Sequence, residues 1–77
     1  MTLEDFSKAC AIRRKHGERG GQAVWNELQK LAPEWVEPFR AGPLDCFYST
    51  QRGAGSDLIL LALEAGVLTP TPRAAGP

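Results

Sequence analysis

The sequence predicts a small all-α protein: a bundle of three main helices and a short proline-bounded helix, followed by a disordered C-terminal tail. Two N-terminal segments place apolar residues at helical spacing, and a third run, Leu58–Leu63, is apolar and carries no charge. A helix that is apolar on all sides needs cover on all sides, so we expect the other helices to pack around this run. Residues 1–68 are assigned to a single helical domain and residues 69–77 to the tail, which has no core-forming residue.

Length and charge narrow the possible functions. A chain of 77 residues forms one domain at most, and a core of that size is only marginally stabilising. Nine Lys and Arg balance nine Asp and Glu, and a net charge of zero disfavours a general nucleic-acid or membrane binder. The acidic N-terminus lacks the apolar stretch of a secretion signal, and the apolar run is far short of the ~20 residues that span a bilayer. We therefore expect a cytoplasmic protein with reduced thiols.

The first helix is predicted over Leu3–His16. Thr2 is a good N-cap, and Thr2-x-x-Asp5 resembles a capping box. Cations occupy the last turn, and Gly17 can end the helix in a left-handed conformation. The apolar face of this helix consists of Leu3, Phe6, Ala9, Cys10 and Ile12.

A second helix is predicted over Gly21–Leu31, after a glycine-rich turn. Glu27 and Lys30 are expected on its polar side. Pro33 ends it, because the residue before a proline avoids the helical region. Pro33 can itself begin a short helix, which Pro38 keeps kinked or about two turns long. The apolar stripe of the second helix consists of Val24, Leu28, Leu31 and Ala32, with Trp25 beside it.

The last helix is predicted over Leu58–Ala65, with Ser56 or Asp57 as its cap and Gly66 as its C′ residue. The preceding loop, residues 49–56, has turn chemistry and almost nothing to bury, so we expect it to be exposed. Glycines before a helix can bind an anion, but the lysine and the strand of a P-loop are absent. A linker is the favoured interpretation of this loop.

The last helix has more apolar residues than its neighbours can cover. We expect Leu60 and Leu63 to remain exposed in a monomer, and an exposed apolar patch usually marks a partner surface. A substitution of Leu60 by Asp should therefore change oligomeric state or partner binding more than it unfolds the domain. The residues that we expect to be covered are Leu58, Ile59, Leu61, Ala62 and Ala65.

Five of the six aromatic residues lie within one third of the chain. Trp and Tyr are enriched at binding hot spots, but a small core also needs bulky residues. We favour the core for Trp25, Trp35 and Phe39, whose helical spacing suits burial. Tyr48, beside the polar loop, is expected at the surface, and Phe47 is left open between the two interpretations.

A basic cluster lies between positions 8 and 19, which hold five of the nine Lys and Arg residues and a single acid, Glu18. It could bind phosphates or an acidic protein surface, but cations at a helix C-terminus also favour the helix dipole, and we favour this second interpretation. A DNA-binding helix-turn-helix fits poorly, because the second helix would present Glu27 to the phosphates. The cluster consists of Lys8, Arg13, Arg14, Lys15, His16 and Arg19.

Cys10, His16 and Cys46, with Asp45 nearby, are the candidates for metal or thiol chemistry. Structural zinc prefers ligands in close sequence pairs, which are absent here. Cysteine–histidine catalysis needs an orienting partner and a cleft. Cys10 is more simply a small core residue. We expect no metal, no cofactor and no catalytic site.

These observations favour a small non-catalytic protein-binding module that docks on a larger protein as an inhibitor, adaptor or assembly factor. Its length suits a phage or mobile-element accessory protein, and we expect a homodimer. The alternative is a small dimeric nucleic-acid-binding regulator that uses the basic end of the first helix. The candidate partner-binding residues are Leu60, Leu63, Tyr48, Arg13, Arg14, Lys15 and Arg19.

Overall fold

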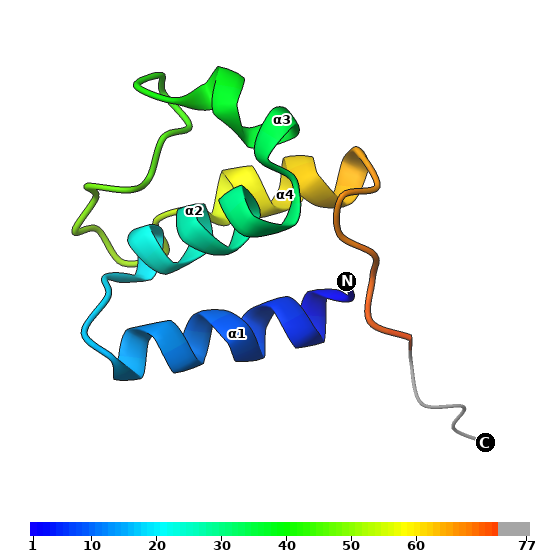
Figure 1. The fold of residues 1–77 in the computed structure, drawn as a ribbon, viewed down its shortest axis with the longest axis horizontal. Coiled ribbons are helices and arrows are strands. Elements are labelled where there is room, and N and C mark those ends of the chain that lie inside the picture. The colour runs from blue at the N-terminus through cyan, green and yellow to red at the C-terminus, as the bar shows by residue number, and fades with distance from the viewer. Residues whose placement is uncertain (73–77) are drawn as a thin grey trace.

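The fold is an all-α globule, as the sequence predicts (Figure 1). The computed structural model describes residues 1–72. Within that range there is no strand, and the only bridge between extended residues joins Thr2 to Thr69. The elements are α1 (Leu3–Lys15), α2 (Gly20–Leu31), α3 (Pro33–Val36), the 3-10 turn η1 (Glu37–Phe39) and α4 (Ser56–Glu64).

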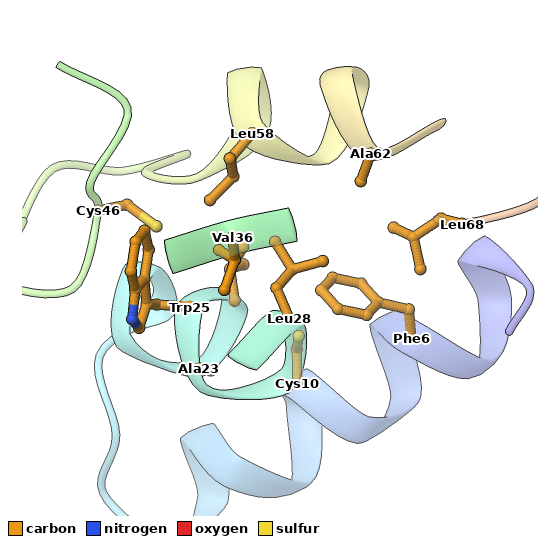
Figure 2. Close-up of a cluster of buried hydrophobic side chains, with 11 residues drawn as sticks. Phe6, Cys10, Ala23, Trp25, Leu28, Val36, Cys46, Leu58, Ala62 and Leu68 are labelled. Atoms are coloured by element: carbon orange, nitrogen blue, oxygen red, sulfur yellow. The ribbon is translucent and has the colours of Figure 1, made fainter. Parts of the chain in front are cut away.

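Helices α1 and α2 form a hairpin, and α4 packs over its apolar side (Figure 1). Figure 2 shows Leu58 and Ala62 pointing from α4 into a central cluster, toward which Phe6 and Cys10 point from α1. The cluster of buried residues consists of Phe6, Cys10, Ala23, Val24, Trp25, Leu28, Val36, Cys46, Leu58, Ala62 and Leu68. The predicted all-α fold is confirmed, but α4 packs against the other helices through one side only, since Leu58 and Ala62 are its buried residues.

The predicted start and end of α1 are confirmed. Thr2 is the N-cap, and its Oγ1 accepts a hydrogen bond of 3.1 Å from the Asp5 amide. The chain leaves the helix through Gly17, whose φ of +97° suits a residue without a Cβ.

The first amides of α1 are satisfied by the C-terminal segment. The Leu3 amide donates to the carbonyl of Thr69 at 2.8 Å, and the Glu4 amide donates to Oγ1 of Thr71 at 2.8 Å. These amides have no partner inside the helix, so the segment completes the cap. The sequence assigns Thr69 and Thr71 to the tail, and it does not predict this pairing. Tail residues 73–77 lie outside the described residues.

The predicted start of α4 is wrong. The helix begins at Ser56, and its N-cap is Gly55, with a φ of +94°. The Ser56 hydroxyl donates instead to the Gly53 carbonyl at 2.7 Å. A Cβ at Gly55 would lie 3.0 Å from a methyl group of Val24, so contact with α2, in addition to capping chemistry, favours a glycine where α4 begins.

The short proline-bounded helix is confirmed. Helix α3 ends at Val36 and continues as η1, because Pro38 has no amide hydrogen to donate to the preceding turn. Trp35 and Phe39 share a face, with ring centroids 5.1 Å apart in an edge-to-face arrangement. Both rings are half-buried and pack against the core, whereas Trp25 is fully within it.

Three expected core residues are exposed. Ile12 lies about 200° around α1 from Cys10, so it faces away from the core and is 58 % exposed. Leu31 is the last residue of α2, where the chain turns toward Pro33, and Ala65 follows the end of α4. The apolar spacing predicted each helix correctly, but it placed these residues wrongly.

The segment that leads into the loop before α4 packs closely against α2 at Gly21. A Cβ at Gly21 would overlap the carbonyl oxygen of Cys46, so only a glycine allows the two backbones to approach this closely. The Cys46 thiol donates to the Gly21 carbonyl at 3.1 Å. This contact buries Cys46, for which the sequence predicted no position.

Candidate protein-docking surface

The outer face of α4 carries an exposed apolar side chain. Leu60 is 58 % exposed, which confirms the prediction for this residue. Leu63 is half-buried and packs against the core, so the prediction that it stays exposed is wrong. Its helical position explains the difference, because Leu63 lies only about 40° around the helix from half-buried Ile59. Ile59, Leu60 and Leu63 together form one apolar strip.

An apolar groove lies beside this strip. It has a volume of about 200 Å³, and Ile59 lines it from α4. Its other sides come from α1, from the start of α2 and from the loop before α4. The residues that line it are Phe6, Ser7, Cys10, Arg14, Gly20, Val24, Gly53, Ala54 and Ile59. The sequence did not predict this groove, because four separate segments form it.

The basic cluster is divided by the fold. Lys8 pairs with Glu4 at 3.2 Å on the surface, and Arg19 donates to the carbonyl of Phe47 at 3.0 Å. Arg14, Lys15 and His16 are exposed. Among residues 1–72, no acid forms an ion pair with Arg14 or Lys15.

Arg13 is held by two carboxylates. Its Nε donates to Glu27 of α2, and its guanidinium lies 3.3 Å from Glu18. The hydrogen bond that Arg13 donates to Glu27 is the main reason that the pKa of Arg13 lies above its ordinary value. Asn26 donates to the second oxygen of Glu18 at 2.8 Å and completes the network. Arg13 thus joins α1 to α2 and is not a free surface charge.

Glu27 is buried, and the prediction that it lies on the polar side of α2 is wrong. The physical reason is its partner, since the guanidinium of Arg13 compensates the carboxylate that α2 turns toward α1. The sequence held one signal for this position, because Glu27 is adjacent to Leu28 and three residues after Val24, both in the apolar stripe.

The aromatic residues divide between the core and the surface. Tyr48 is 81 % exposed, as predicted, and its ring meets Phe47 edge to face at 4.8 Å. Trp25 is buried, and the guanidinium carbon of Arg40 lies 5.5 Å from its ring centroid. This cation–π contact covers the edge of the core.

Both cysteines are free and buried. Burial raises the pKa of Cys10 to about 11, and burial also raises the pKa of Cys46. Within residues 1–72, no three His, Cys, Asp or Glu side chains gather in a way that could hold a metal ion. The exposed loop before α4 borders a second, more polar hollow of about 250 Å³.

No helix among residues 1–72 is long and apolar enough to cross a membrane. Of the features described above, the apolar strip and its groove are the candidate surface for contact with another molecule. No protein-family model, curated protein or solved structure matches this chain.

Proposed function

We propose that this protein is a non-catalytic protein-binding module that docks on a larger protein through the outer face of α4. The observation that carries the proposal is Leu60, which is 58 % exposed in the middle of a helix whose residues 58–63 carry no charge. Full burial of an exposed leucine is worth roughly 1.5–3 kcal/mol, and burial of the exposed part of Leu60 contributes a fraction of that to association. Such a protein acts as an inhibitor, adaptor or assembly factor.

Neighbouring residues support the same surface. Ile59 and Leu63 extend the apolar contact beyond Leu60, and the adjacent groove adds a concave part. Arg14 and Lys15 supply exposed charge that steers association. Arg13 and Arg19 bind within the chain, so we leave both out of the proposed surface. Tyr48 remains a second predicted contact.

The experiment is a pull-down from host lysate with the tagged protein and two matched variants. Leu60 and Ile12 are equally exposed, at 58 %, but Ile12 does not line the groove or belong to the α4 strip. We expect Leu60→Asp to lose a stoichiometric partner that Ile12→Asp retains, while both variants keep the helical circular-dichroism spectrum. If the wild type captures nothing stoichiometrically, the proposal fails. If Leu60→Asp simply unfolds the monomer, α4 is only core and the interface lies elsewhere.

We also propose that the protein acts in the cytoplasm as a homodimer. The two unpaired thiols fit a reducing compartment, and small domains with a single core often rely on self-association for stability. Light scattering across the micromolar range tests the dimer. A monomer at every concentration would exclude it.

The alternative function is a small dimeric nucleic-acid-binding regulator. The exposed Arg14, Lys15 and His16 at the end of α1 favour it, whereas the net charge of zero does not. Retention on a heparin or DNA column at ~150 mM salt, lost when Arg14 and Lys15 are replaced by Ala, would favour this regulator over the docking module.

A further inference from the structure

The groove between α1 and α4 has room for one bulky side chain. Its volume is about 200 Å³, and a protein cavity of about 150 Å³ accepts benzene. Phe6, Cys10 and Val24 contribute to its lining, and each is at most 7 % exposed. These residues belong to the core, so core packing holds the floor of the groove in place. A leucine or phenylalanine from a partner fits such a space.

The groove has one charge at its edge. Arg14 is the only charged residue among those that line it, and it is exposed. Arg13, the next residue along the chain, is paired with Glu18 and Glu27, whereas no acid among residues 1–72 pairs with Arg14. Burial raises the pKa of Cys10 to about 11, and the charge of Arg14 acts in the opposite direction. The guanidinium therefore lies within electrostatic reach of the buried thiol that lines the groove.

We propose that this groove receives a partner segment that carries a bulky apolar anchor and, within one helical turn of it, a carboxylate that pairs with Arg14. The inference rests on the proposed docking function and names the chemistry of the partner. The apolar lining takes the anchor, and the carboxylate supplies the complementary charge. A charge-assisted hydrogen bond at the edge of an apolar groove is stronger and more selective than an apolar contact alone.

The test is selection from a random linear peptide display library on the full chain. Peptides with Leu, Ile, Phe or Trp close to Asp or Glu are expected to enrich. Arg14→Glu should lower the affinity for the enriched peptides roughly tenfold, which corresponds to the loss of one charge-assisted hydrogen bond. Replacement of the peptide's acid by Lys should restore binding to Arg14→Glu.

Two further variants make the test specific. Lys15→Glu changes the charge by the same amount on the next residue, which does not line the groove, and it should leave affinity within about twofold, as expected for a screened surface charge. Ser7→Phe places a large side chain on an exposed lining residue and should block the groove. Peptides without an acid, or an equal loss in Arg14→Glu and Lys15→Glu, would overturn the proposal. A dimer that Ser7→Phe dissociates would also overturn it, because a second copy would then fill the groove.

Different experiments test the proposed groove ligand and the proposed docking function, so one proposal can fail while the other stands. If Leu60→Asp loses the lysate partner while Arg14→Glu and Ser7→Phe keep it, docking stands and the assignment of the groove is overturned. If the charge-swapped peptides behave as expected while the pull-down is empty, the groove chemistry is supported and the docking function fails.

Discussion

The α1–α2 hairpin and helix α4 are held in place by different forces. The hairpin combines apolar contacts with a polar network in which Arg13 binds both Glu18 and Glu27. Helix α4 contributes apolar side chains to the core, chiefly Leu58 and Ala62. Among residues 1–72, its only side-chain hydrogen bond runs from Ser56 to Gly53 of the preceding loop.

This difference explains where a free surface arises. Hydrogen bonds are directional, so the polar network sets how α1 lies on α2. Apolar burial is not directional, and α4 needs only one side of its surface to reach the core. On the opposite side Leu60 is exposed and uncovered, with the exposed residues Asp57 and Glu64 as its neighbours along the helix surface. The proposed docking surface therefore belongs to the region that the fold constrains least.

The largest effect is expected where the two regions meet. Phe6 is fully buried and lies beside Leu28 and Leu68 (Figure 2). Phe6→Ala should cost about 3–5 kcal/mol through lost burial and a new cavity. That loss is comparable to the whole stability of a domain of this size, about 4–12 kcal/mol. Urea denaturation monitored by circular dichroism measures it, and a midpoint close to that of the wild type would contradict a shared core.

The polar network predicts a second, smaller effect. Arg13→Met leaves the buried carboxylate of Glu27 without its partner and should cost roughly 2 kcal/mol, since Arg13 is itself partly exposed. Arg13→Met combined with Glu27→Leu should recover most of that loss, because both charges are then removed. Denaturant titrations of the single and double variants form the cycle. If the two losses simply add, the pair does not hold the hairpin.

Alanine substitution of two adjacent glycines at the start of α2 should change the stability of the protein in opposite directions. Gly21→Ala forces the Cys46 backbone away and should destabilise the protein by about 1–3 kcal/mol. Gly20→Ala meets nothing within 4 Å and should stabilise it by up to ~1 kcal/mol through helix propensity. Thermal unfolding of the two variants measures both. Equal shifts of the unfolding temperature in the two variants would show that Gly21 does not hold Cys46 against α2.

The last prediction is a dependence of stability on alkaline pH. Burial, together with the charge of Glu27, raises the pKa of Cys10 from its ordinary value near 9 to about 11. The native state thus holds the thiol neutral more firmly than the unfolded state does. The stability that depends on the neutral thiol is therefore fully present below pH 9 and is lost as the pH rises toward 11. Unfolding free energies across that range should fall less steeply in Cys10→Ala, and parallel slopes would contradict the assignment.

Local sequence signals predicted the helices well. Helix ends were predicted at Thr2, Gly17 and Pro33, because capping and proline chemistry depend on only a few neighbouring residues. The apolar run predicted α4 and the exposure of Leu60.

The features that the sequence missed depend on residues distant in the chain. Gly55 starts α4 in close contact with Val24 of α2, and Glu27 is buried because Arg13 of α1 reaches it. The groove requires α1, α2, α4 and a loop at once. Periodicity within one helix cannot supply these relations. The positions of Ile12 and Leu63 are a different case, because their helical angles to Cys10 and Ile59 account for them.

The hydrogen bonds of Thr69 with the N-terminal residues hold the two ends of the described chain together. The Thr69 amide donates to the carbonyl of Met1 at 3.0 Å, while its own carbonyl accepts from Leu3. A circular permutant that joins the two ends and opens the exposed loop at Arg52 would keep every helix whole. In that rearranged order α4 would be made first, the α1–α2 hairpin second, and α3 with η1 last.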